Sequence, residues 1–134
     1  MVKSILAVLT GLVVGFITIF LVELVAQQVY PLPSEVNLQD PEAMGAYMAN
    51  APMGSLVLVL MAYALGSFLG GMVAARLAPN KKMVHAIVVG ILLLLAGIAN
   101  FYLLPHPIWF IISAVIIYPL MSFFGGAMGS RDMP

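Results

Sequence analysis

Cysteine is absent from this 134-residue chain, and charged residues make up only 7% of it. The lack of cysteine excludes disulfides, thiol nucleophiles and thiolate metal ligands. The shortage of charge excludes the basic surface that nucleic acid requires, so we expect no nucleic-acid partner. Hydrophobic residues fill the chain instead, at 63% with a mean hydropathy of +1.14. This composition is typical of an integral membrane protein, for which the lipid bilayer is the expected surroundings.

Motifs of catalysis and cofactor binding are missing as well. The sequence contains no H-E-x-x-H zinc motif, no G-x-S-x-G nucleophile motif and no glycine-rich phosphate loop between a strand and a helix. The two histidines, His85 and His106, are expected at opposite membrane surfaces, where they cannot share a metal ion. We therefore expect no enzymatic activity, no cofactor and no metal site.

Four apolar stretches are long enough to cross a bilayer as helices, at about residues 4–30, 54–77, 84–104 and 108–128. The first continues too far beyond Lys3 for a signal peptide, so an uncleaved span is expected. Pro31 ends it, and Pro119 inside the fourth span predicts a kink. The sequence thus predicts an all-α integral membrane protein with four transmembrane helices in one domain, residues 1–134.

The long loop of residues 31–53 carries a helix signal of its own. Asp40 suits an N-cap, Pro41 the first helical position and Glu42 the first turn. Apolar residues then recur at helical spacing, at Met44, Tyr47, Met48 and Ala51. The pattern predicts a short interfacial helix that closes the loop on the membrane surface, with a gating or substrate lid as the alternative.

The charges are segregated by sign although they sum to zero. The basic residues fall at the N-terminus, the second-to-third loop and the C-terminus: Lys3, Arg76, Lys81, Lys82 and Arg131. The first loop holds acidic residues and no basic one. The positive-inside rule then predicts a multi-pass protein of a bacterial-type inner (plasma) membrane with both termini in the cytoplasm. Tyr30, Tyr102 and Trp109 are expected at the outer interface, as in aromatic belts.

The segment from Tyr63 to Pro79 recurs, with changes, as residues 118–134. Identical residues match at a constant offset of 55: Tyr63–Tyr118, Leu65–Leu120, Ser67–Ser122, Phe68–Phe123, Gly70–Gly125, Gly71–Gly126, Arg76–Arg131 and Pro79–Pro134. A weaker match relates the first span to the third at an offset of 79. We interpret the chain as two tandem two-helix repeats, 1–79 and 80–134, related by a pseudo-two-fold axis along the membrane normal.

Small residues follow one face of the repeated helix. Gly66 and Gly70 form a G-x-x-x-G, a spacing that lets membrane helices approach closely. The predicted helix-packing seam comprises Tyr63, Gly66, Ser67, Gly70 and Gly71 of the second span with Tyr118, Ser122, Gly125 and Gly126 of the fourth. We expect this seam to pack helices together within the chain, between the copies of a homo-oligomer, or against the helix of a partner protein.

Glu23 is the one ionisable residue in the interior of an apolar span. An acid at mid-membrane costs about 2.5–3.5 kcal/mol on insertion scales, so such a residue is a functional candidate. Glu23 lies roughly 30 Å along the helix from Lys3, near the outer interface. We predict an outward-facing polar pocket for an ion or ligand, formed by Glu23, Gln27, Asn100 and Ser113. The alternative is an interfacial Glu with hydrated neighbours and an interhelical Asn hydrogen bond.

Two functions follow from these patterns. The abundance of small-residue seams favours a small membrane protein that acts by helix–helix contacts, as an accessory or assembly subunit or a homo-oligomer within a larger membrane complex. The alternative is a small oligomeric transporter or channel for a cation, proton or small polar solute that uses Glu23.

Overall fold

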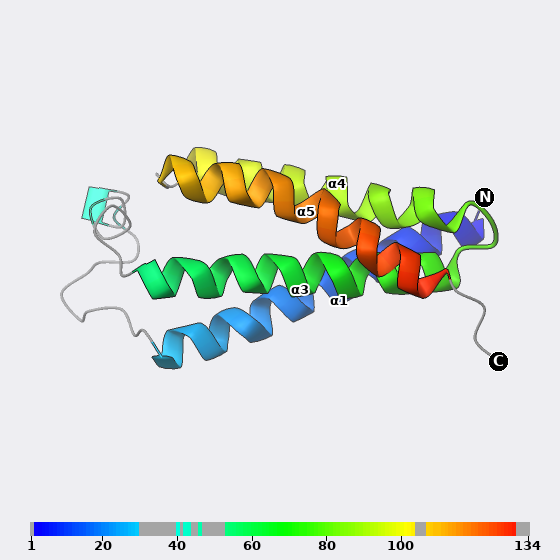
Figure 1. The fold of residues 1–134 in the computed structure, drawn as a ribbon, viewed down its shortest axis with the longest axis horizontal. Coiled ribbons are helices and arrows are strands. Elements are labelled where there is room, and N and C mark those ends of the chain that lie inside the picture. The colour runs from blue at the N-terminus through cyan, green and yellow to red at the C-terminus, as the bar shows by residue number, and fades with distance from the viewer. Residues whose placement is uncertain are drawn as a thin grey trace.

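The computed structural model describes residues 2–29, 40, 42, 43, 46, 53–103 and 107–130. Within these ranges the chain forms α1 (Val2–Val29), α3 (Met53–Leu77), α4 (Lys82–Leu103) and α5 (Ile108–Gly129). Each of the four is long and apolar enough to cross a membrane. The prediction of an all-α protein with four potential transmembrane helices is confirmed, and the helix ends lie within two residues of the expected ones. α5 continues through Pro119 and changes direction near its middle (Figure 1).

The four helices run along one bundle (Figure 1). α1 begins, and α5 ends, at the end of the bundle where α3 connects to α4. α3 lies in the middle, with α4 and α5 on one side. The first half of α1 packs on α3, and the second half of α1 leaves the bundle on the side away from α4 and α5.

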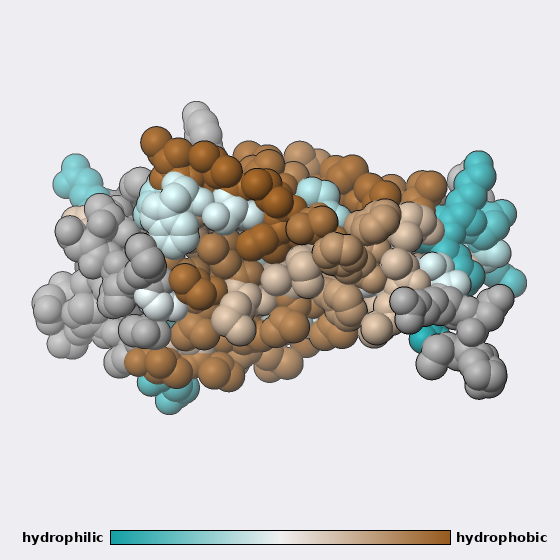
Figure 2. Space-filling model, in the orientation of Figure 1, coloured by the Kyte–Doolittle hydropathy of each residue, from teal (hydrophilic) through white to brown (hydrophobic). Residues whose placement is uncertain are grey.

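Apolar side chains cover the middle of the bundle, and polar side chains gather at its ends (Figure 2). Only 17–39% of the most apolar stretch of each helix is buried inside the protein. The exposed side chains include large ones such as Leu6, Val13 and Phe20 of α1. Water does not tolerate an apolar surface this continuous, whereas lipid does, so this band is the surface that a bilayer would cover.

Glycine brings α1 and α3 into backbone contact. A Cβ atom on Gly70 would lie 2.7 Å from the carbonyl oxygen of Gly11, and one on Gly66 would lie 2.9 Å from that of Gly15. Neither site has room for a side chain. α1 has no glycine or alanine between Gly15 and Ala26, and bulkier side chains such as Ile19, which lies against Gly66, keep its backbone away from α3. This distribution explains why α1 diverges from the bundle in its second half.

The remaining seam residues join α5 to α3 and α4. A Cβ atom on Gly71 would lie 2.6 Å from the carbonyl oxygen of Ser122, and one on Gly126 would lie 2.5 Å from the Ala86 side chain. Gly125 likewise packs on the Phe68 backbone. All nine residues of the predicted seam are buried. The seam is therefore occupied by packing within one chain.

The connection between α3 and α4 is fixed by a lysine. The Lys82 ammonium donates hydrogen bonds to the carbonyl oxygens of Ala75 and Ala78, each at 3.1 Å. Lys81 turns the chain with a φ of 46°. A cation at a helix C-terminus satisfies carbonyls that lack intrahelical partners and complements the helix dipole. The basic loop thus has a structural role as well as its expected topological one.

Candidate functional site

A cavity of about 250 Å³ lies between all four helices, in the half of the bundle where α1 ends. Its walls are Phe16, Ile19 and Glu23 of α1, Tyr63 of α3, Leu93, Ala96 and Gly97 of α4, and Tyr118 of α5. The divergence of α1 leaves this space, since the glycine contacts between α1 and α3 end at Gly15 and Gly66. Three helices therefore contribute a polar side chain to the wall of one open cavity, and the other side chains of the wall are apolar.

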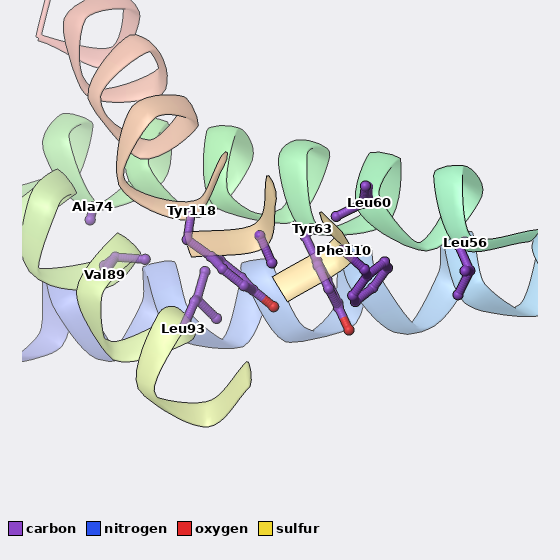
Figure 3. Close-up of a cluster of buried hydrophobic side chains, with 9 residues drawn as sticks. Leu56, Leu60, Tyr63, Ala74, Val89, Leu93, Phe110 and Tyr118 are labelled. Atoms are coloured by element: carbon purple, nitrogen blue, oxygen red, sulfur yellow. The ribbon is translucent and has the colours of Figure 1, made fainter. Parts of the chain in front are cut away.

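Two tyrosines from equivalent positions of the sequence repeat form one wall of the cavity. The rings of Tyr63 and Tyr118 stack with centroids 5.0 Å apart and an interplanar angle of 25°. Both residues are buried, with exposed fractions of 5% and 2%. Figure 3 shows the two hydroxyl groups projecting to the same side of the cluster. The pair thus presents two hydroxyls from one rigid aromatic unit.

The tyrosine pair is held by close packing. Phe110 is fully buried and meets the Tyr63 ring edge-on at 5.9 Å. On the other side, Gly97 lies against Tyr118: a Cβ atom there would be 3.1 Å from both Cε2 and the hydroxyl oxygen of that ring. Aromatic pairs at these distances and angles are favourable beyond the area that they bury. The position of the hydroxyls is consequently set by the bundle core.

Glu23 reaches the cavity from α1, where it is half-buried. The described basic residues are Lys3, Arg76, Lys81 and Lys82, and all four lie at the opposite end of the bundle. Among the described residues, therefore, no basic side chain is placed to neutralise the carboxyl group. A half-buried carboxylate among apolar side chains without a counter-charge favours binding of a cation or a proton.

Two of the other predicted pocket residues, Gln27 and Ser113, do not line the cavity. Gln27 lies one turn further along α1 and is exposed. The Ser113 hydroxyl donates a hydrogen bond of 2.7 Å to the carbonyl oxygen of Trp109, in its own helix. Asn100 belongs to α4, one turn after Gly97, but its side chain lies outside the described residues. Of the predicted set, Glu23 is the one that the structure places in the cavity.

Tyr63 and Tyr118 were predicted to pack helices, and they also line the site. The available signal was chemical: a tyrosine inside a membrane helix carries a hydroxyl that needs a polar neighbour. Within the part of the chain that is described, no three His, Cys, Asp or Glu side chains come together. Among the described residues, the polar side chains that line the cavity are thus one carboxyl group and two phenols.

These features define the class of the protein, which is a multi-pass helical membrane protein with an acidic, tyrosine-lined cavity. No family model matches the chain, and neither the curated proteins nor the solved structures include a significant match to it.

Proposed function

We propose that this protein is a small transporter or channel that takes up a cation, a proton or a small polar solute through the Glu23 cavity. The observation that carries the proposal is the placement of one carboxyl and two tyrosine hydroxyls in a cavity built by all four helices. Intramembrane acids that face a cavity commonly mark ion and substrate pathways.

The proposed setting is a bacterial-type inner membrane with both termini in the cytoplasm. The support is the charge pattern, since the described basic residues gather at one end of the bundle and Asp40 and Glu42 belong to the opposite loop. With this orientation the cavity lies in the outer half of the membrane. An interfacial helix in the outer loop is part of the proposal: the Glu42 N–H donates a 3.0 Å hydrogen bond to the Asp40 carboxylate, as at a helix N-cap. Glu42, Ala43 and Ala46 are helical, and the other residues of the predicted helix lie outside the described residues.

A pseudo-two-fold relation between residues 1–79 and 80–134 also belongs to the proposal. It is supported by Tyr63 and Tyr118, which occupy equivalent positions and stack on each other. The first helix of each unit packs on the second through small residues, with Gly11 against Gly70 in one and Ala86 against Gly126 in the other. Glu23 stands outside this relation, because its aligned residue is Tyr102.

Association with other chains is the other predicted function, and it stays a prediction. The seam that motivated it is buried within one chain, so an oligomer or a membrane complex would need a different surface. The exposed apolar face of α1 is available to lipid and to other helices alike.

Flux through purified protein in liposomes tests the proposal. Three probes would be measured under an inward-directed membrane potential: protons with an entrapped pH dye, sodium ions and radiolabelled methylammonium. We expect at least one of them to enter faster than in protein-free liposomes, and Glu23→Gln to reduce that rate to the protein-free level. Gln27→Ala is the control, since this exposed residue does not line the cavity. Equal rates for wild type and Glu23→Gln, or no flux of any probe, would refute the proposal.

A further inference from the structure

We infer that the Glu23 cavity recognises a primary ammonium group, carried by a small aliphatic amine or by the headgroup of an amine-bearing lipid. This inference names the ligand of the proposed site and so rests on the proposed function. Its basis is the presence of one carboxyl side chain and two tyrosines in the wall of an open cavity whose other side chains are apolar.

The polar groups of the cavity match the donors of an ammonium group. A primary ammonium has three N–H donors and no acceptor, whereas a carboxylate accepts only and a hydroxyl can accept even while it donates. Glu23 supplies the charge, and Tyr118 and Tyr63 supply hydroxyl oxygens. Hydrogen bonds from a charged donor to a carboxylate are about twice as strong as neutral ones. This combination favours a cation that carries N–H groups.

The same walls disfavour a divalent metal ion. Calcium takes about six to eight oxygen ligands, and magnesium keeps an octahedral shell of oxygens. The described side chains of the wall offer one carboxyl group and two phenol hydroxyls, and the other side chains are hydrocarbon: Phe16, Ile19, Leu93 and Ala96. These apolar groups would instead contact the hydrocarbon part of an amine.

A quaternary ammonium fits less well than a primary one. Recognition of quaternary groups depends on exposed aromatic faces around the cation. Tyr63 and Tyr118 turn one face each toward the other, and Phe110 packs against Tyr63. The pair directs its hydroxyls to one side, as Figure 3 shows. A trimethylammonium group has no N–H donor for these oxygens.

The volume of the cavity and the position of its opening restrict the part of the ligand beyond the ammonium group. A volume of about 250 Å³ lies below the roughly 300–1,000 Å³ of sites for drug-sized molecules, so a short amine or a headgroup is indicated. Phe16 of α1 and Ala96 of α4 are both exposed, so the cavity opens on the lateral surface of the bundle between these helices. Glu23 lies six residues before the end of α1, about 9 Å along the axis, within reach of headgroups.

Binding of radiolabelled n-butylamine tests the inference. It would be measured by scintillation proximity at neutral pH, where the amine is protonated, on protein in nanodiscs of phosphatidylcholine alone. We expect saturable binding that Glu23→Gln weakens at least about tenfold, and Tyr118→Phe about threefold to tenfold. Gln27→Ala should bind as the wild type does. Unlabelled n-butyltrimethylammonium should compete at least about tenfold less well than n-butylamine.

A lipid arm separates the two sources of the amine. Nanodiscs that contain phosphatidylethanolamine should suppress butylamine binding in the wild type if the headgroup occupies the site, and should leave it unchanged if a free amine is the ligand. Tyr118→Phe keeps the stacked ring and so tests the hydroxyl even if Glu23→Gln does not fold. Absence of saturable binding, equal competition by the quaternary amine or full binding by both variants would overturn the inference. Flux of sodium or protons without amine binding would leave the proposed function intact. Amine binding without flux would overturn the proposed function alone.

Discussion

Ser67 and Ser122 occupy equivalent positions of the sequence repeat, and both are fully buried. They differ in their hydrogen bonds. The Ser122 hydroxyl donates to the Pro119 carbonyl oxygen at 3.0 Å, whereas the Ser67 hydroxyl has no hydrogen-bond partner among the described residues. A buried polar group without a partner costs roughly 1–3 kcal/mol, and a satisfied one contributes modestly. The serine hydroxyl is therefore expected to lower the stability of the fold at position 67 and to raise it at position 122.

Alanine at each serine tests this difference. We expect Ser67→Ala to leave thermal stability unchanged or raise it, by up to about 1 kcal/mol, because the buried hydroxyl is removed. Ser122→Ala should lower stability by about 0.5–1 kcal/mol, in the range of hydrogen bonds within membrane bundles. Thermal unfolding in detergent, followed by tryptophan fluorescence, measures both variants. A larger loss for Ser67→Ala than for Ser122→Ala would show that Ser67 does have a partner.

At the scale of the helix, glycine contacts bring the backbone of α1 against that of α3 in the first half of α1. Gly66→Leu should be strongly destabilising, because a Cβ atom there would meet the Gly15 carbonyl oxygen at 2.9 Å and the Ile19 side chain at 2.5 Å. Overpacking of this kind costs typically about 1–3 kcal/mol, and more when backbone must move. Urea unfolding in micelles would measure the loss. The control is Leu65→Ile, a neighbouring exposed site, which should behave as the wild type does.

The α3–α4 connection yields a second prediction at this scale. Lys82→Met should lower the free energy of unfolding by about 0.5–2 kcal/mol, because the carbonyl groups of Ala75 and Ala78 lose their cationic donor. Lys81→Met removes an equal charge from an exposed position and is the matched control. Equal effects of the two substitutions, measured by the same unfolding assay, would show that net charge matters here rather than capping.

For the whole molecule, the absence of cysteine makes the orientation directly measurable. A single cysteine at Asn80, exposed between α3 and α4, should react with a membrane-impermeant maleimide only after the cells are permeabilised. A cysteine at Gln28, exposed near the end of α1, should react in intact cells. The reverse labelling pattern would invert the proposed topology and turn the cavity toward the cytoplasm.

The positions of the helices along the chain were predictable, because they depend on local runs of residues in the sequence. Runs of apolar residues about twenty long mark each span, and proline and lysine mark the ends, so α3, α4 and α5 were expected within two residues of where they lie. Glu23 was identified for a similar reason, as a single acid among apolar neighbours. Gln27 and Ser113 were grouped with it by depth alone, and depth does not determine which way a side chain turns around the helix axis.

The sequence by itself thus determined that this is a four-helix membrane protein, where each helix begins and ends, and which residues are chemically out of place in lipid. Only the tertiary structure shows which helices and side chains contact one another. A G-x-x-x-G motif lets another helix pack closely, but the motif does not indicate which helix that is. Only the packed bundle shows that Gly66 and Gly70 contact α1. The tertiary structure also shows that Tyr63, Tyr118 and Glu23 line one cavity. These residues are far apart in the sequence, and the path of α1 after Gly15 determines how far Glu23 lies from the two tyrosines.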